Sequence, residues 1–249
     1  MLKDVIVNHY EPGLQTKPSL IFSIFNKKNE NHMKNVHFLP WVGSKYNIGW
    51  QGKRLMIMGE SHYCASLKDA VPSITHDIIT DLFDADSEHE AYKNTYTKFM
   101  RSLTGHPLSN EEKREAWNRV LFYNFVQEPL TGPHKAPTAE QFRKSDTAFF
   151  EVLETFRPDC IIAWGKRLYD NLPRCGYQLD DVMAPDGKVI ETWAYETRDG
   201  HVVQVLPIMH PSAAFSPDYW HEVIESFLSR QRNLKRTFTT YLHTSIRCL

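Results

Sequence analysis

The sequence lacks any apolar segment long enough to cross a membrane as a helix. A membrane-spanning helix needs about 20 consecutive, mostly apolar residues, and no run of 18 such residues occurs in this chain of 249 residues. The first residues, MLKDVIVNHYEPG, also lack the apolar core of a secretory signal peptide. We therefore expect a cytoplasmic protein without a membrane partner.

Cysteine is scarce, and the cysteines are far apart. The four residues are Cys64, Cys160, Cys175 and Cys248, and no two of them form a CxxC pair. Secreted domains that depend on disulfide frameworks use many cysteines in a short chain. The spacing therefore favours reduced thiols, as in a cytosolic protein.

The chain has almost no net charge, because 29 Lys and Arg residues balance 30 Asp and Glu residues, with a formal net charge of −1. No overall positive field therefore draws the chain to nucleic acid, although a local basic patch is compatible with these numbers. The sequence contains no internal repeat and no low-complexity linker. The length and the hydrophobic content of 41% suit a single domain over 1–249, in which 1–50 form an irregular, polar segment.

Four apolar runs predict buried strands. They are RLMIMGE at 54–60, RVLFYNF at about 119–125, DCIIAWG at 159–165 and VVQVLPIMH at 202–210. Strands that alternate mainly with helices form parallel sheets covered on both faces. The sequence therefore predicts an α/β fold, a three-layer α/β/α sandwich with a short, mainly parallel central sheet of four strands.

Helix start signals lie between these runs. In a capping box, a Ser or Thr and a Glu or Gln three residues later satisfy each other's backbone N–H groups. A short helix is expected from Gly165 to about residue 172, a polar excursion over 173–200, and a last helix over about 217–235. The capping boxes pair Ser87 with Glu90, Ser109 with Glu112, and Thr138 with Gln141.

Polar groups stand at the carboxyl ends of three predicted strands. They are Gly59 with Glu60, Asn124, and His210. In open α/β sheets these ends share one edge, where ligands bind. Pro211 also restricts His210 to extended geometry, because a proline disfavours the helical region for the residue before it. The pattern predicts a site at this edge; the simpler interpretation of His210 is a strand end beside a turn.

Four motifs in this order resemble those of the uracil-DNA glycosylase superfamily. They are the first loop MGESHY, the strand end LFYNFV, the strand and helix start IIAWGKRLYDNL, and the strand end VLPIMHPSAAF. Between the second and third motifs, a Pro-rich loop, a Pro-Thr helix start and RPD before a strand follow the same layout. The resemblance covers roughly 54–228. It implies a DNA glycosylase, which flips a base out of DNA and hydrolyses the N-glycosidic bond.

The resemblance implies catalytic roles for residues at these strand ends. Cleavage of the glycosidic bond leaves negative charge on the departing base, so a donor such as His210 is expected to stabilise it. Asn124 can pair with the base edge, because its side chain carries both a donor and an acceptor; its simpler role is to cap a turn. Glu60 or Ser61 is expected to orient the attacking water.

The first loop is also expected to shape the base pocket. Tyr63 matches the position of a pocket wall, and Gly59 and His62 of the same loop are also expected to contact the base. Phe125 or Trp164 could support this wall, although both also suit the ordinary core.

Two further segments are expected to contact DNA. Ser212 and Ala213 approach the strand, and Phe215 is a wedge that fills the gap left by the flipped nucleotide. Lys166 and Arg167 form a basic patch with the end of the last helix, which carries Arg230, Arg232, Lys235 and Arg236.

Two positions of the first loop depart from the best-known uracil enzymes. Ser61 stands where those enzymes have Asp, and His62 stands where they have Pro. The first departure moves water activation to Glu60 or to another residue. The second, with the polar inserts at 64–118 and 173–200, suits a wider pocket.

These departures leave the substrate open. The superfamily includes phage-defence enzymes that remove glucosylated 5-hydroxymethylcytosine, so a cytosine with a bulky C5 group is one candidate. An ordinary uracil-excision repair enzyme and an inactive relative that binds DNA or flipped bases are alternatives. A small α/β hydrolase using Ser61 and His210 is a further one, but the sequence has no G-x-S-x-G elbow.

We expect a monomer that acts on DNA containing a modified or damaged base and that holds no cofactor. Superfamily members with a GE first loop carry an iron–sulfur cluster, which needs four ligands. Here no cysteine precedes the first motif, and Gln127 lies where a ligand would be expected.

Purified protein is therefore expected to be colourless and to contain neither iron nor stoichiometric zinc. Elemental analysis and the visible absorption spectrum measure this directly. About four irons per chain, as in a [4Fe–4S] centre, would contradict the interpretation of the cysteines.

Overall fold

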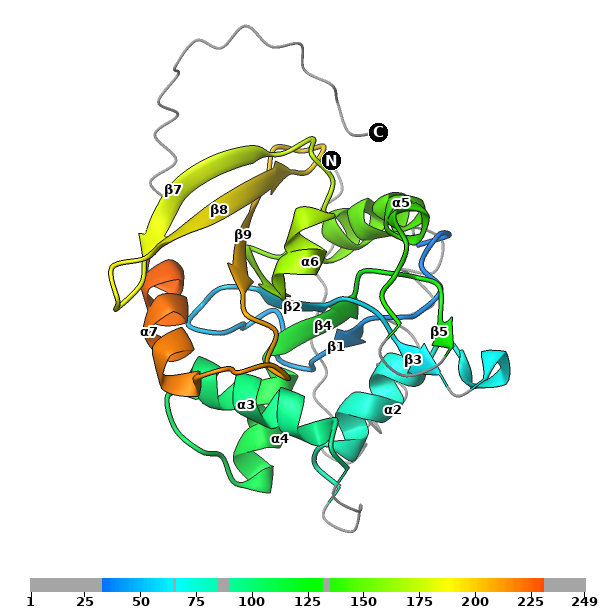
Figure 1. Cartoon of the computed structure of the whole chain (residues 1–249), viewed down its shortest axis with the longest axis horizontal. Helices are drawn as coiled ribbons and strands as arrows, with labels where there is room; N and C mark the ends of the chain where they lie inside the picture. The colour runs from blue at the N-terminus through cyan, green and yellow to red at the C-terminus, as the bar shows by residue number, and fades with distance from the viewer. Residues whose placement is uncertain (1–32, 65, 85–89, 132–134, 231–249) are drawn as a thin grey trace, which may run out of the picture.

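The computed structural model describes residues 33–64, 66–84, 90–131 and 135–230. These residues form a mixed sheet of seven strands in the order β1-β4-β2-β6-β9-β8-β7 (Figure 1). Helices accompany the sheet, so the protein is α/β, as the sequence predicts. The strands are β1 (Trp41–Val42), β2 (Leu55–Gly59), β4 (Val120–Asn124), β6 (Cys160–Trp164), β7 (Tyr177–Met183), β8 (Val189–Glu196) and β9 (Val202–Ile208).

The centre of the sheet consists of the four strands that the sequence predicts. β4, β2, β6 and β9 lie side by side, and each neighbouring pair is parallel. Every residue of β2, β4 and β6 is buried. Strands that are covered on both faces appear as almost continuous apolar runs, which is why the sequence reveals them.

The predicted extent of the sheet is wrong, since it has seven strands and is mixed. β1, from the segment expected to be irregular, pairs antiparallel with β4. β8 and β7 extend the other edge as an antiparallel hairpin within 173–200, which was expected to be a polar excursion. Most side chains of β7 are exposed, so no apolar pattern marks that strand.

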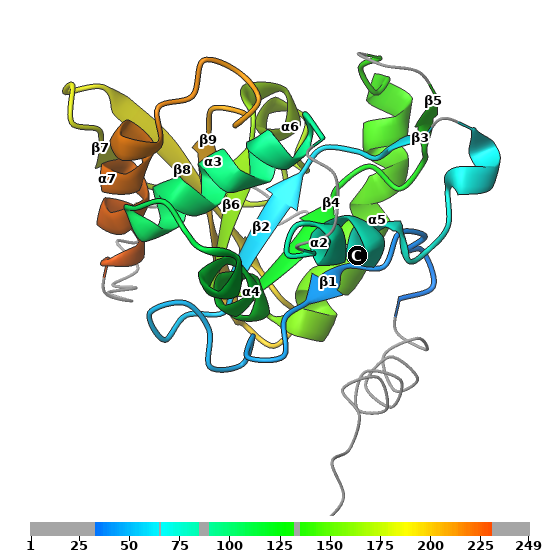
Figure 2. The same cartoon turned by 90° about the horizontal axis from the view of Figure 1, so that it is seen from below.

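Side chains of β2 point alternately to two helical layers. Leu55 and Ile57 pack in one apolar cluster with residues of α2, α3, α4 and α7, whereas Met56 and Met58 pack with residues of α5 and α6. Figure 2 shows α3, α4 and α7 on one side of the parallel strands and α5 on the other. The helices are α2 (Ile74–Asp81), α3 (Lys93–Thr104), α4 (Asn110–Asn118), α5 (Ala139–Phe156), α6 (Lys166–Asp170) and α7 (Pro217–Leu228), with a 3-10 turn η2 (Leu67–Asp69).

The helix starts agree with two of the three predicted capping boxes. Ser109 caps α4 and Thr138 caps α5, each with the reciprocal bond from the residue three positions later. The box at Ser87 lies outside the described residues. α6 follows Gly165 as predicted but ends at Asp170.

The last helix is shorter than the predicted 217–235, because α7 ends at Leu228. Among its predicted basic residues, Arg230 follows the helix, and Arg232, Lys235 and Arg236 lie outside the described residues.

A small second sheet holds the first loop in place. β3 (Tyr63–Cys64) and β5 (Leu130–Thr131) pair in parallel. Val126 N–H donates to Glu60 O at 2.8 Å, and Leu130 N–H donates to His62 O at 3.0 Å. The loop that follows β2 is therefore fixed by backbone bonds to the segment that follows β4.

The cysteines differ in state. Cys64 and Cys160 are free and buried, whereas Cys175 is disulfide-bonded. The prediction of reduced thiols is therefore wrong for Cys175. In the described part of the chain, no helix combines the length and the apolar character needed to span a membrane.

Candidate functional site

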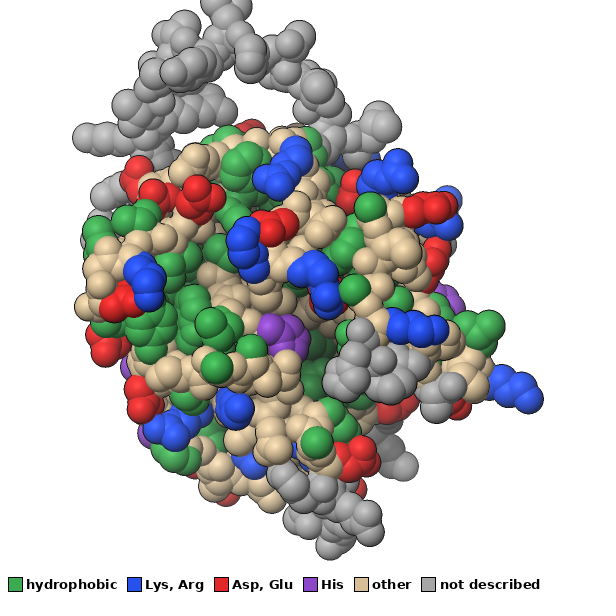
Figure 3. All heavy atoms as spheres, in the orientation of Figure 1, with side chains coloured by type: hydrophobic (Ala, Val, Ile, Leu, Met, Phe, Trp, Pro, Cys, Tyr) green, Lys and Arg blue, Asp and Glu red, His purple; other side chains and the backbone are tan. Residues whose placement is uncertain are grey.

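A cavity of about 1070 Å³ opens at the carboxyl ends of the parallel strands. Gly59 ends β2, Asn124 ends β4 and Trp164 ends β6, and all three line it. His210 lies two residues beyond β9 and lines it as well. Figure 3 shows this face of the molecule, hollowed near its centre with Lys and Arg side chains along one side of the hollow. The structure thus brings the predicted strand ends together at one edge.

The His210 ring is fixed by the turn that follows it. Nδ1 of His210 accepts the backbone N–H of Ser212 at 3.2 Å and lies 2.7 Å from Ser212 Oγ. Because Nδ1 accepts a hydrogen bond, the single hydrogen of a neutral imidazole lies on Nε2. Burial lowers the pKa of His210, while Glu60 raises it and Arg167 lowers it further. The side chain therefore stands at the cavity as a neutral donor.

Gly165 makes room for this histidine. Its backbone has φ +97°, and a Cβ at this position would lie 3.3 Å from the Cβ of His210. A side chain would be strained at that φ. The glycine after β6 thus lets the turn after β9 approach β6 closely.

Asn124 crosses over Gly59, its register partner in the sheet. A Cβ on Gly59 would lie only 2.1 Å from Asn124 Oδ1. The side-chain carbonyl of Asn124 occupies the space that a larger residue at position 59 would fill. This contact sets the position of the carboxamide at the cavity edge.

His62 supports Asn124 from the protein interior. The Nδ2 atom of Asn124 lies 3.2 Å from Nδ1 and 3.0 Å from Nε2 of His62, and these similar distances place the amide over the ring. His62 Nε2 also lies 2.9 Å from Thr75 Oγ1. Burial lowers the pKa of His62 to about 3, so the ring is neutral. The structure places His62 behind Asn124 and not in the cavity wall.

Glu60 and Arg167 form an ion pair in the cavity wall. Arg167 Nε donates to Glu60 Oε2 at 2.7 Å, and Arg167 Nη2 donates to Oε1 at 2.6 Å. The Glu60 side chain is 10% exposed, while that of Arg167 is 53% exposed. Ser61 also lines the cavity, and its buried Oγ has no hydrogen-bond partner among the described residues.

Aromatic side chains form much of the wall. Tyr63 is half-exposed at the cavity. Trp164 is buried and packs against Phe122 and Tyr96, with ring centroids 5.3 and 5.4 Å away. Phe125, the other predicted support, packs against α5 and does not line the cavity.

The segment after His210 was expected to contact DNA, and only some of its residues are exposed. Ser212 lines the cavity, and Ser212 and Ala213 are exposed. Phe215 is buried and stacks on Trp220, with ring centroids 6.0 Å apart and planes at 9°. It therefore belongs to the core and is not an exposed wedge. Met209, a large apolar residue just before His210, is exposed and lines the cavity.

Several residues line the cavity that were not predicted from the sequence. Tyr92 and Tyr96 come from the start of α3, Ile190 comes from β8, and Trp220 comes from α7. Tyr92 and Tyr96 are four residues apart and so share one helix face. This spacing is the feature of the sequence that could have identified them as a pair. Nothing in the sequence indicates that this face meets the strand ends.

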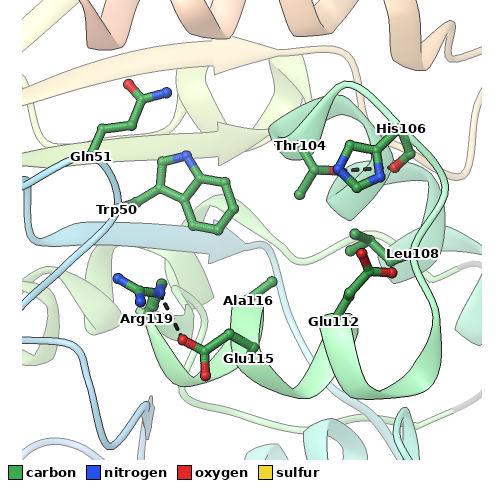
Figure 4. A pocket seen from close by; sticks show the side chains of 9 residues that line it. All are labelled: Trp50, Gln51, Thr104, His106, Leu108, Glu112, Glu115, Ala116 and Arg119. Atoms are coloured by element: carbon green, nitrogen blue, oxygen red, sulfur yellow. Dashed lines mark hydrogen bonds and ion pairs between the residues drawn. The ribbon is translucent and has the colours of Figure 1, made fainter.

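A second, more open cavity of about 380 Å³ lies beside α4 (Figure 4). Its charged side chains already have partners. Arg119 Nε donates to Glu115 Oε1 at 3.0 Å, and Glu112 accepts from Ser109 in the helix cap. The cavity at the strand ends is the stronger candidate, because it also gathers His210 and Asn124.

Comparisons with known proteins add no family to this geometry. No protein-family model matches the sequence, and no curated protein matches it. Within the described ranges, no group of three or more His, Cys, Asp or Glu side chains is placed to hold a metal ion. The cavity itself is therefore the feature from which a function can be inferred.

The close contact between Gly59 and Asn124 can be tested by stability. Gly59→Ala places a Cβ 2.1 Å from Asn124 Oδ1, so we expect a loss of about 1–3 kcal/mol in the free energy of unfolding, as in other overpacked sites. Urea denaturation measures it. In an Asn124→Ala background the clash is removed, and the cost of Gly59→Ala should fall. An equal cost in both backgrounds would contradict this packing.

Proposed function

We propose that this chain is a DNA glycosylase and a divergent member of the uracil-DNA glycosylase superfamily. It flips a uracil or a modified base out of DNA into the cavity and hydrolyses the N-glycosidic bond, leaving an abasic site. The observation that carries the proposal is the arrangement at the strand ends. A neutral histidine donor, a carboxamide and a carboxylate, from His210, Asn124 and Glu60, line one cavity.

His210 stabilises the leaving base. When the glycosidic bond breaks, its electron pair stays on the base, which becomes an anion. A preoriented N–H group directed at the atom that gains charge lowers the barrier. The hydrogen on Nε2 of His210 suits this task, because the bond from Ser212 already occupies Nδ1.

Asn124 reads the edge of the flipped base. A carboxamide offers an acceptor and two donors, and contacts with Gly59 and His62 hold this one in place. Because His62 is buried and neutral, it adds no charge beside Asn124.

Stacking on the aromatic side chains of the cavity offsets part of the free energy needed to flip the base. Removing a base from the stack costs a few kcal/mol, and stacking on an aromatic side chain returns about 1–3 kcal/mol. Tyr96 and the half-exposed Tyr63 line the cavity and supply such surfaces, with the buried Phe122 and Trp164 behind them. Met209, exposed beside His210, takes the place of Phe215 as the apolar side chain facing the gap in the DNA.

The attacking water is oriented by Glu60 or Ser61. Glu60 presents a carboxylate at the cavity, and the buried Oγ of Ser61 has no partner among the described residues. Ser61 Oγ is not bonded to His210, whose Nδ1 contacts Ser212 instead. This arrangement gives no support to a hydrolase that uses Ser61 and His210 as nucleophile and base.

The size of the cavity favours a bulky substrate base. Pockets of about 300–1000 Å³ accommodate drug-sized ligands, and this cavity of about 1070 Å³ is larger than an unmodified pyrimidine needs. Thr95, Glu191 and Ser212 also line it and offer partners for sugar hydroxyl groups. A glucosylated 5-hydroxymethylcytosine of phage DNA is therefore the substrate that we favour, in an antiphage role in the cytoplasm.

DNA contacts come from the rim of the cavity. Lys166 and Ser212 are exposed and line the cavity, and the exposed Ala213 follows Ser212, so a monomer presents these residues together. The alternatives are an ordinary uracil-excision enzyme and an inactive relative that binds flipped bases.

Removing the imidazole of His210 is expected to abolish most activity without unfolding the protein. Loss of one preoriented donor typically lowers the rate about 10²–10³-fold, so His210→Ala should slow single-turnover base release by this factor. The matched control is His106→Ala, an exposed histidine of the second cavity, which should keep the wild-type rate. If His210→Ala releases the base at the wild-type rate, His210 has no catalytic role and only ends the strand beside a turn.

The substrate is tested by comparing two DNAs under single-turnover conditions. We expect faster release of glucosylated hydroxymethylcytosine than of uracil, because polar groups built to bind a sugar are left unpaired by a smaller base. Abasic sites are quantified by alkaline cleavage of labelled oligonucleotides. Fast uracil release without cleavage of the modified base would instead identify an ordinary repair enzyme.

A further inference from the structure

The ion pair between Glu60 and Arg167 connects two segments that converge on the cavity. Glu60 directly follows β2, and Arg167 lies in the first turn of α6. Two N–H groups of Arg167 donate to the two carboxylate oxygens, at 2.7 and 2.6 Å. Two parallel, charge-assisted bonds of this kind fix both the position and the plane of the carboxylate.

Lys166 and Arg167 are adjacent in sequence but differ in their surroundings. Lys166 is 85% exposed, and its Nζ pairs with Asp170 on the same short helix. Exposed pairs of this type are weak and easily exchanged for another anion. Arg167 instead pairs with a carboxylate that is only 10% exposed. Releasing Arg167 to a phosphate would leave Glu60 largely buried and without its cation.

The carboxylate keeps acceptor capacity beyond this pair. An ionised carboxylate has about four lone-pair sites, and Arg167 occupies two of them. The remaining sites can accept hydrogen bonds from a water molecule in the cavity that Glu60 lines. A carboxylate whose plane is fixed holds that water in a defined direction.

We propose that Arg167 is a positioning residue that orients Glu60 toward the attacking water, in place of the DNA phosphate contact expected from its charge. This role rests on the proposed glycosylase function. Water oxygen forms a bond to the sugar carbon, and the N-glycosidic bond breaks with its electron pair on the base. The proton lost by water passes to the Glu60 carboxylate and then to solvent.

The test separates the rate of base release from DNA binding. Arg167→Ala is expected to slow single-turnover release about 10–100-fold, because displacement of a catalytic group by about 1 Å costs up to 10². DNA affinity and its salt dependence should stay near wild type. Arg167→Lys keeps the charge but loses the two-pronged geometry, so it should recover only part of the rate. Added guanidinium ion should restore part of the rate of Arg167→Ala.

Three comparisons make the assignment specific. In a Glu60→Gln background, Arg167→Ala should cause no further loss, because residues that act as a unit are not additive. Lys166→Ala serves as the phosphate-contact comparison and should reduce the slope of log affinity against log salt by about 0.9. Arg174→Ala, an exposed arginine just after α6, should change neither quantity.

The outcomes distinguish this role from the proposed function. A wild-type rate in Arg167→Ala, with weaker binding and a smaller salt slope, would make Arg167 a phosphate contact and overturn the proposal. An equal loss in the Glu60→Gln background would overturn it too, because Arg167 would then not act through Glu60. If the wild-type protein releases no base from either DNA, the proposed function fails, and this role fails with it.

Discussion

The site depends on the register of the central parallel strands. Gly59 lies opposite Asn124 in the pair of β2 and β4, and Trp164 lies opposite Ile208 in the pair of β6 and β9. A slip of one residue would turn every side chain of a strand to the other face. Because both faces are buried against helices, this register is strongly determined. Segments far apart in the sequence therefore meet at one edge with fixed spacing.

Two glycines at this edge allow the polar side chains to approach. Gly59 leaves room for the carboxamide of Asn124, and Gly165 leaves room for the backbone that carries His210. At both positions a small residue at the end of one strand lets its neighbour present a larger group. The close approach belongs to the pair of strands and not to either strand alone.

Burial and pairing set the charges of the side chains at the strand ends. His62 is neutral because it is buried, and burial also lowers the pKa of His210. Arg167 compensates the charge of Glu60 across the cavity wall. Neutral donors and one paired carboxylate can be oriented before a ligand arrives, and such groups need no rearrangement during a reaction.

The strands β7 and β8 do more than extend one edge of the sheet. β8 brings Val189, Ile190 and Glu191 to the cavity, so the hairpin that extends the sheet also forms part of the cavity wall. Arg230 donates to the backbone carbonyls of Asp180 and Asp181 on β7. Unpaired groups on an edge strand invite pairing with other chains, and these bonds occupy part of that edge.

The sequence alone determined the four central strands, the starts of α4 and α5, and the meeting of Glu60, Asn124 and His210 at one edge. Buried parallel strands are apolar throughout, and capping depends on neighbouring residues, so both leave local patterns. The rest depended on contacts between distant segments. β7 is exposed and has no apolar pattern, Phe215 is buried by Trp220, and His62 faces Thr75 and Asn124 in place of the cavity. Only the tertiary structure decided that Arg167 pairs with Glu60, because a charge in a sequence does not reveal which partner the fold brings to it.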